Sequence, residues 1–179
     1  MTIFMTRHGQ TDWNLQKRVQ GRVDIPLNKT GIEQAKITSQ KLKNEKIDII
    51  VCSPLIRAKK TAEIINEKLH CPIIYEENIA ERDFGELEGK LTSEFDFSTF
   101  WNYQKNVKYE KAENIKEFFK RVYQTLDKII AQYPEKNILI VSHGGVSVPV
   151  YCYFNGIPEN ENLLDSCCLN NCEVVKYSV

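Results

Sequence analysis

The feature that most limits how this chain can fold is the alternation of short apolar runs with helix-like stretches over its first 75 residues. Apolar runs begin at Ile3, Ile47 and Ile73, and each is short enough to be a buried strand. Residues 31–44 and 53–70 lie between these runs and are predicted as helices. Strands that alternate with helices in this way form a parallel sheet covered by helices.

Two helix starts carry local signals. Thr30 is expected to cap the helix over residues 31–44, and Ser53 the helix over residues 53–70, with Pro54 in its first turn. His70 stands at the predicted end of the second helix, where a cation suits the helix dipole. We therefore expect a structural role for His70.

The second half of the chain extends the same pattern. Apolar side chains keep helical spacing through residues 112–133, residues 137–141 are predicted as a buried strand, and residues 146–154 as a helix. The tail over residues 167–177 is split by two asparagines and is predicted as a closing hairpin. Such a hairpin would add an antiparallel edge to a mostly parallel sheet.

Two segments lack a clear period and are predicted as loops, residues 12–28 and residues 80–89. Aromatic side chains gather between Phe95 and Tyr103, where we expect short helices over the edge of the sheet. This aromatic group could be part of the core or an apolar wall for a ligand, and the sequence leaves both open.

Length and charge narrow the possible functions. A chain of 179 residues is expected to form a single domain over residues 1–179. Lys plus Arg and Asp plus Glu number 24 each, so the net charge is zero and offers no basic field for nucleic acid. No long apolar run predicts a membrane span. Met1 leads directly into the first strand and leaves no room for a signal peptide, so a cytoplasmic location is expected.

The six cysteines do not form a C-x-x-C pair. In a cytoplasmic chain they are expected to be reduced thiols rather than disulfides. Cys167, Cys168 and Cys172 lie close together in sequence but lack the spacing of a zinc site. Their role is left open.

Four basic side chains are expected at one edge of the sheet. His8 and His143 each follow an apolar strand directly and precede a glycine. Arg7 precedes His8, and Arg57 falls in the first turn of the helix after the second strand, where free N–H groups also attract anions. Because parallel strands end at the same edge, these four groups should converge on one small anion. One such histidine or arginine alone would be read as structural or solvated.

The chemistry of these side chains points to phosphate. The planar guanidinium of Arg7 matches phosphate oxygens, and His8 can act as a nucleophile near neutral pH. The sequence therefore predicts that His8 attacks a phosphoryl group held by Arg7.

Several stretches, in order along nearly the whole chain, resemble the histidine phosphatase superfamily in its phosphoglycerate-mutase-like branch. They are residues 6–14 (TRHGQTDWN), 18–27 (RVQGRVDIPL), 52–58 (CSPLIRA), 81–89 (ERDFGELEG), 142–146 (SHGGV) and 171–174 (NCEV). A lone R-H-G would be a weak signal, but ordered motifs of this number are specific. The resemblance implies a three-layer α/β/α fold that works with no metal and no cofactor.

The resemblance also implies roles for individual residues. His8 would carry a phosphohistidine intermediate, with its other ring nitrogen held by a backbone carbonyl, and Glu81 would protonate the leaving oxygen and then take a proton from water. A surface charge is the alternative reading of Glu81. The residues expected to hold the phosphoryl oxygens are Arg7, Arg57 and His143, with Asn14 as a neutral donor and Gln20 and Gly21 lining the substrate side.

The expected function is that of a metal-independent phosphatase acting on a small phosphomonoester. A cofactor-dependent phosphoglycerate mutase is the main alternative, but residues 90–111 form a short segment without arginine and the chain ends at Val179, soon after its last predicted strand. A non-catalytic family member that only binds a phospholigand would lack the nucleophile or the acid. A flavodoxin-like or nucleotide-binding module would need a glycine-rich phosphate loop, which is absent.

The partner is expected to be a small phosphorylated metabolite. Phosphosugars, phosphoserine, phosphoglycerate and α-ribazole phosphate all stay open as substrates. The sequence leaves the oligomeric state open as well, with a homodimer as one alternative.

Overall fold

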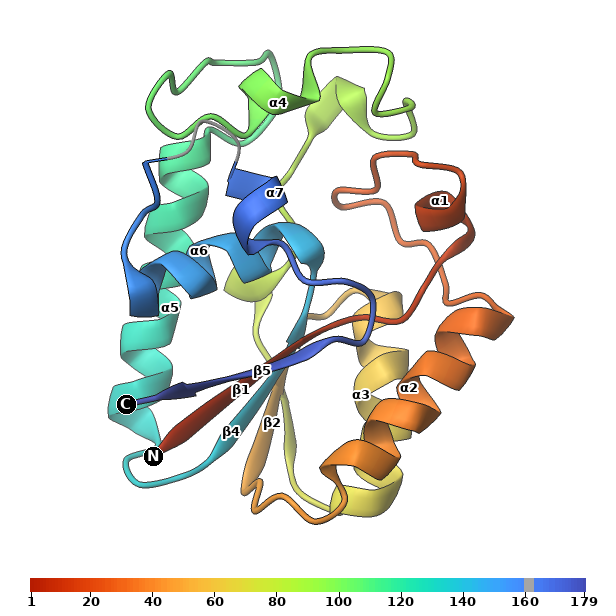
Figure 1. Cartoon of the computed structure of the whole chain (residues 1–179), viewed down its shortest axis with the longest axis vertical. Coiled ribbons are helices and arrows are strands. Elements are labelled where there is room, and N and C mark those ends of the chain that lie inside the picture. Colours follow the sequence, from red (N-terminus) through yellow and green to blue (C-terminus); the bar gives the residue numbers. More distant parts are fainter. Residues whose placement is uncertain (160–162) are drawn as a thin grey trace.

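Five strands form one sheet in the order β3-β2-β4-β1-β5 in residues 1–159 and 163–179, the part of the chain that the computed structural model describes (Figure 1). The strands are β1 (Thr2–Arg7), β2 (Ile49–Cys52), β3 (Ile73–Tyr75), β4 (Ile138–Ser142) and β5 (Val174–Ser178). The first four are parallel to one another, and β5 pairs antiparallel with β1. The predicted mostly parallel sheet with an antiparallel edge is confirmed.

Helices cover both faces of the sheet, which gives the expected three-layer α/β/α fold. On one face α2 (Lys29–Leu42) packs against α3 (Ile56–Leu69), and on the other α5 (Ile115–Gln132) packs against α6 (Gly144–Asn155) (Figure 1). The remaining short elements are α1 (Asp12–Leu15), α4 (Phe97–Phe100), α7 (Leu163–Cys167) and the 3₁₀ turns Glu77–Ile79 and Gly85–Leu87. In Figure 1 the three short helices lie beyond the carboxyl ends of the parallel strands.

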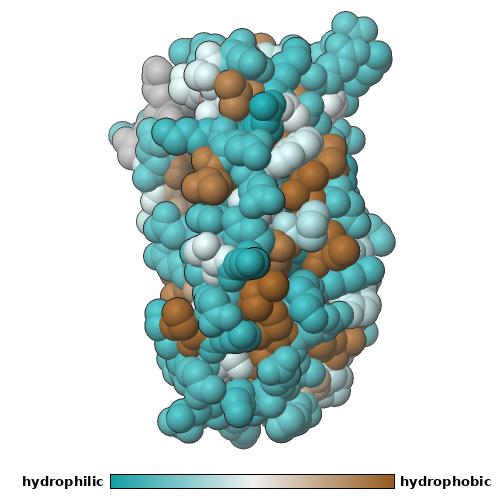
Figure 2. All heavy atoms as spheres, turned by 90° about the vertical axis from the view of Figure 1, so that its right-hand side faces the viewer, coloured by the Kyte–Doolittle hydropathy of each residue, from teal (hydrophilic) through white to brown (hydrophobic). Residues whose placement is uncertain are grey.

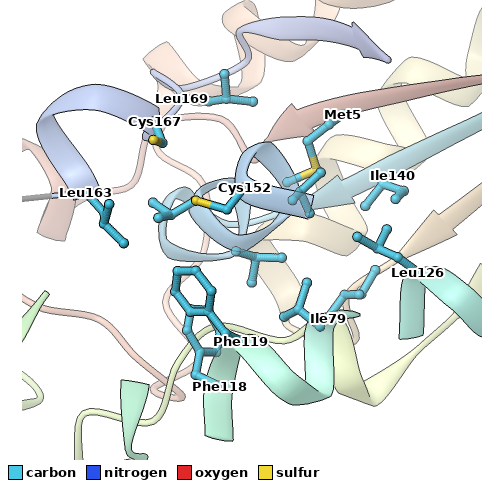
Figure 3. Close-up of a cluster of buried hydrophobic side chains, with 14 of the residues drawn as sticks. Met5, Ile79, Phe118, Phe119, Leu126, Ile140, Cys152, Leu163, Cys167 and Leu169 are labelled. Atoms are coloured by element: carbon cyan, nitrogen blue, oxygen red, sulfur yellow. The ribbon is translucent and has the colours of Figure 1, made fainter. Parts of the chain in front are cut away.

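The buried side chains of each strand alternate between the two helix layers, as the two-residue period of a strand requires. Ile3 and Met5 pack with side chains of α5, α6 and α7, the cluster drawn in Figure 3. Phe4 points to the other face and packs with Ala58 and Ala62 of α3. Because both faces of β1 are covered, its sequence is a continuous apolar run rather than an alternating one.

Both predicted helix caps are wrong. The cap of α2 is Asn28, whose side-chain oxygen accepts from the Gly31 N–H at 2.9 Å, so Thr30 already lies inside the helix. No side chain of the N-cap residue bonds the start of α3. Instead, the carboxylate of Asp24 accepts from the Ile56 N–H at 2.7 Å. A carboxylate from a neighbouring loop satisfies the helix start and its dipole as well as a local cap does.

The predicted C-terminal hairpin is also wrong, although its antiparallel edge is real. The segment that ends at Cys167 is helix α7, and β5 pairs with β1 in a register that sets Ile3 opposite Tyr177. The free edge of β1 offers the last strand a complete ladder of hydrogen bonds, which a short local hairpin would not. The predicted loop over residues 12–28 likewise contains α1, which starts with a capping box formed by Thr11 and Asn14.

The surface that bears α1 and α2, turned to the viewer in Figure 2, is mostly hydrophilic, with hydrophobic side chains in small groups between polar ones. Within the described residues, no helix has the length and apolar character needed to cross a bilayer.

Candidate active site

The structure brings His8 and His143 together at the carboxyl edge of the sheet. β1 and β4 are neighbours in a register that sets Arg7 opposite Ser142, and the His8 N–H donates to the Ser142 carbonyl at 2.9 Å. The residue that follows each strand is a histidine, so His8 and His143 lie side by side at the edge of the sheet. The two rings meet edge to face, with centroids 5.2 Å apart.

The tautomer of His8 is fixed by its surroundings. The ring is buried, with 2% of its surface exposed, and Nδ1 lies 2.7 Å from the carbonyl oxygen of Gly9. A carbonyl can only accept, so Nδ1 carries the proton and Nε2 keeps its lone pair. Arg57 Nε donates to this lone pair at 3.2 Å. Burial and the charges of Arg57 and Arg7 hold the pKa of His8 well below its usual value, which keeps the ring neutral.

Arg57 is a rigid, fully buried fork. It is the second residue of α3, and its terminal nitrogens donate to the carbonyls of Val23 and Gly21, each at 2.8 Å. Burial lowers the pKa of Arg57 to about 10, against the opposing effect of the Glu81 and Asp24 carboxylates. The side chain therefore stays cationic at neutral pH while its orientation is fixed before any ligand arrives.

The buried side-chain atoms without a hydrogen-bond partner among the described residues include two nitrogens of the predicted site, Arg7 Nε and His143 Nδ1. The rest of each side chain is held: Arg7 donates to the Leu169 carbonyl at 2.9 Å, and His143 Nε2 lies 2.7 Å from the Ser53 hydroxyl. Burial, with Arg57, His8 and Arg7 nearby, keeps the pKa of His143 well below its usual value. A buried polar group without a partner costs about 1–3 kcal/mol, so these two atoms fit a site that binds an anion.

Glu81 lines the same cavity as His8 and Arg57 and is only 9% exposed. One carboxylate oxygen accepts from the N–H of Arg82 at 2.9 Å, and the other from the N–H of Gly145 at 3.0 Å. Gly145 is in the first turn of α6, so Glu81 also caps that helix end. The reading of Glu81 as a surface charge is wrong, because the carboxylate is nearly buried.

These side chains line one cavity of about 270 Å³. Of the residues singled out from the sequence, it is lined by Arg7, His8, Asn14, Gln20, Gly21, Arg57 and Glu81. His143 does not line the cavity; it is fully buried and contacts the site through the ring of His8. Among residues 1–159 and 163–179, no three His, Cys, Asp or Glu side chains are grouped so that they could hold a metal ion.

Asn14 and Gln20 are ordered by a small hydrogen-bond network beneath the cavity. The Asn14 oxygen accepts from the Thr11 N–H at 3.1 Å and from Asn171 at 3.3 Å, while the Gln20 oxygen accepts from the Thr11 hydroxyl at 3.0 Å. With its oxygen engaged, Asn14 can offer only its NH₂ group to a ligand.

A sequence model of the histidine phosphatase superfamily (branch 1) matches residues 3–179. The chain belongs to this family. Among curated members, it is 43% identical over 173 residues to "Uncharacterized phosphatase PhoE" of Bacillus subtilis, covering 96% of this chain and 87% of the relative. It is 34% identical to "Probable phosphoglycerate mutase GpmB" of Photorhabdus laumondii, covering 80% of this chain and 70% of the relative.

Solved structures share this fold over almost the whole chain. YhfR of Bacillus stearothermophilus superposes with a TM-score of 0.90 at 28% identity, covering 99% of this chain and 91% of that one. Phosphoserine phosphatase of Entamoeba histolytica, solved in complex with 3-phosphoglyceric acid, gives a TM-score of 0.85 at 28% identity, covering 98% and 89%.

The aromatic group of this family member serves both of the purposes that its sequence left open. Phe97 and Trp101 line the cavity with Phe84, and the ring centroids of Phe84 and Trp101 are 6.0 Å apart. Phe100 is buried in the core and stacks on Phe84 at 4.9 Å.

Several residues of the site were not predicted. Lys17, Arg18 and Cys168 also line the cavity, and Ser53 holds His143. Ser53 could have been found, because it follows β2 at the same sheet edge as the two histidines. Lys17 and Arg18 carry no comparable signal, since they come from a loop that folds over the site.

The neutral, buried histidines should make the stability of this histidine phosphatase depend on pH. Their pKa values are depressed in the folded state, so the unfolded chain binds more protons below its own histidine pKa of about 6.5. The free energy of unfolding should therefore fall as pH decreases from 7 to 5.5, by about 1 kcal/mol for each histidine. Urea unfolding at the two pH values, in a buffer free of phosphate, measures this.

Substitution isolates the contribution of each ring. His8→Asn and His143→Asn should each remove about 1 kcal/mol of the pH-dependent change, whatever they do to stability at pH 7. The matched control for replacing a histidine is His70→Asn at the exposed, left-handed C-cap of α3, where asparagine is tolerated. An unchanged slope in both active-site variants would contradict the neutral, buried assignment.

Gly145 provides a test of how closely Glu81 is packed. A Cβ atom at this position would meet the Glu81 carboxylate and come within 2.7 Å of Trp101 Cη2. Gly145→Ala should therefore shift Glu81 and lower kcat about tenfold or more. Overpacking against the buried Trp101 costs about 1–3 kcal/mol, more than alanine gains as a helix former, so the melting temperature should fall as well and kcat is measured well below the new transition. Wild-type kcat in this variant would show that the position of Glu81 does not matter.

Proposed function

We propose that this chain is a metal-independent phosphatase that hydrolyses a small phosphomonoester through a phosphohistidine at His8. The observation that carries the proposal is the tautomer of His8. Its Nδ1 proton is committed to the Gly9 carbonyl, so Nε2 keeps the lone pair. That lone pair accepts from Arg57 Nε in the free protein and is released for attack when this N–H turns to a phosphoryl oxygen in the cavity. A neutral imidazole with one fixed proton is ready to attack phosphorus without first losing a proton.

The positive and polar groups around Nε2 suit the charge of a transferring phosphoryl group. Arg57 supplies a fixed cation, and Arg7 Nε is a buried donor without a partner. When the Ser53 hydroxyl donates to His143 Nε2, Nδ1 of that ring carries a proton, and this unpartnered N–H lies beside the His8 ring rather than on the cavity wall, so a phosphoryl oxygen must enter next to His8 to reach it. Asn14 adds its NH₂ group. Donors that are in place before the reaction stabilise the charge of the transition state most effectively.

Glu81 completes the proposed reaction in two steps. In the first, the bond from His8 Nε2 to phosphorus forms as the ester P–O bond breaks, and Glu81 gives its proton to the leaving oxygen. In the second, water attacks phosphorus, the P–N bond breaks, and Glu81 takes the proton that the water loses. Glu81 and His8 line the same cavity, so a phosphomonoester bound there can meet both the nucleophile and the acid–base group.

We favour hydrolysis over phosphoryl transfer to a second hydroxyl group. The Bacillus subtilis relative, which is 43% identical to this chain, is named a phosphatase. The Photorhabdus laumondii relative, which is 34% identical, is named a probable phosphoglycerate mutase. Besides the phosphate-binding groups, the cavity is lined by apolar side chains, among them Val19, Phe84 and Phe97, and by Lys17 and Arg18, while residues 90–111 contribute no arginine to it. Phosphoserine, phosphoglycerate, phosphosugars and α-ribazole phosphate are the substrates to compare.

The deciding experiment is a phosphate-release assay with chelator present, against a panel of these phosphomonoesters. 3-Phosphoglycerate is tested with and without 2,3-bisphosphoglycerate. Chelator-resistant phosphate release is the expected result. Interconversion of 2- and 3-phosphoglycerate without net release would overturn the phosphatase in favour of the mutase. Tight binding of phosphorylated ligands with no turnover on any of them would point to a non-catalytic family member.

A further inference from the structure

The segment that carries Glu81 has no regular structure of its own to hold it. It runs between two short 3₁₀ turns, Glu77–Ile79 and Gly85–Leu87, and lies outside the sheet. A catalytic carboxylate must be held to within about half an ångström of its working position. Something outside the segment must therefore supply that rigidity.

The side chain of Arg121, on α5, donates hydrogen bonds to the backbone of this segment. One terminal nitrogen donates to the Asn78 carbonyl at 2.6 Å, and the other to the Glu81 carbonyl at 3.1 Å. The side chain is only 17% exposed and does not line the cavity. Arg121 thus holds the main chain at Glu81 and three residues before it, without reaching the substrate.

Glu113 also bonds this segment, and its carboxylate fixes the orientation of the Arg121 side chain. Its carboxylate accepts two hydrogen bonds from Arg121, at 2.6 and 2.9 Å, and a third from the Asp83 N–H at 3.2 Å. Its backbone carbonyl accepts from Arg82 at 2.9 Å, and its N–H donates to the Asp83 carbonyl at 2.8 Å. Residues 81, 82 and 83 are therefore all tied to this one ion pair.

We propose that the Arg121–Glu113 ion pair is a positioning device for the general acid–base Glu81. Two parallel hydrogen bonds fix the relative orientation of the two side chains, and each side chain is only 17% exposed. The other hydrogen bonds of the pair go to the backbone of the Glu81 segment instead of to water. The inference rests on the proposed role of Glu81 and adds two residues that lie 32 and 40 positions along the chain from it.

Substrates with different leaving groups can show whether Arg121 positions Glu81 or only stabilises the fold. A poor leaving group such as an alkoxide needs the proton from Glu81, whereas 4-nitrophenolate leaves without it. A misplaced Glu81 should therefore slow alkyl phosphates while sparing 4-nitrophenyl phosphate. A variant that merely loosens the fold would lower both rates alike.

The experiment measures kcat/KM, which covers the step in which the leaving group departs, for 4-nitrophenyl phosphate and for an alkyl phosphate from the active panel. Arg121→Met should lose about tenfold or more on the alkyl substrate and less than about twofold on the nitrophenyl substrate. Arg121→Lys, which keeps the charge but not the fork, should fall between Arg121→Met and the wild type. The control is Lys120→Met on the same helix, an exposed residue whose side chain makes no hydrogen bond or ion pair with the described residues of the Glu81 segment, and it should leave both substrates unaffected.

Glu81→Gln is measured in parallel so that two kinds of failure can be told apart. If Glu81→Gln slows both substrates equally, the proposed acid–base role of Glu81 is wrong. If Glu81→Gln is selective for the alkyl substrate but Arg121→Met slows both equally or neither, the positioning role is overturned while Glu81 keeps its role. Should Arg121→Met fail to give a cooperative melt, Arg121→Lys and Glu113→Gln decide by the same selectivity.

Discussion

A His8→Ala variant is expected to lose turnover on every phosphomonoester that the wild type hydrolyses, by a factor on the order of 10⁴ or more. The reason is that the ring supplies the atom that bonds to phosphorus. The thiol of Cys168 also lines the cavity, but burial raises its pKa, so it is not a thiolate that could take the place of His8. Initial rates at saturating substrate measure the effect directly.

Loss of turnover must be distinguished from loss of the site. Arg7, Arg57 and Asn14 stay in place in His8→Ala, so inorganic phosphate should still raise the melting temperature of the variant. The exposed His70 supplies the control, since His70→Asn should keep the wild-type rate. A His8→Ala protein that turns over at a rate close to that of the wild type would rule out His8 as the nucleophile.

The second large effect is expected at Arg57. Arg57→Lys keeps a positive charge but removes the fork that now spans His8 and the carbonyls of Val23 and Gly21. We expect kcat to fall by about 10² to 10³, as when one preorganised donor is removed from an oxyanion site. Steady-state kinetics on the best substrate of the panel measure this.

Lys60 offers a matched control on the same helix. Lys60→Ala breaks only an exposed ion pair with Glu63, so kcat should not change. Arg57→Lys activity within about threefold of the wild type would mean that charge alone, without geometry, holds the phosphoryl group.

The sheet edge could be predicted because the rule that governs it is simple. Each of β1, β2 and β4 is a short apolar run, parallel strands end at one edge, and the residue after each run is therefore placed without knowledge of the packing. His8 and His143 were located in this way, and Ser53 follows the same rule.

Contacts between distant segments could not be predicted in this way. The start of α3 is capped by Asp24, 32 residues earlier, and β5 pairs with β1 across the whole length of the chain. Thr30 and Ser53 have suitable side chains for local caps, and only the folded loops decide that other oxygens take those places. The hydrogen bond from Arg121 to the Glu81 carbonyl is another contact between distant segments. Helical periodicity places Arg121 on α5 but does not predict which group its guanidinium contacts.

The proposed mechanism requires a covalent bond between His8 Nε2 and phosphorus. The most direct measurement is a rapid acid-free quench of the enzyme during turnover, followed by mass spectrometry of the intact protein and of its peptides. We predict a mass increase of one phosphoryl group, acid-labile and base-stable, located on His8 and absent from His8→Ala. A phosphoryl group on any other residue, or burst kinetics without a labelled histidine, would contradict the mechanism.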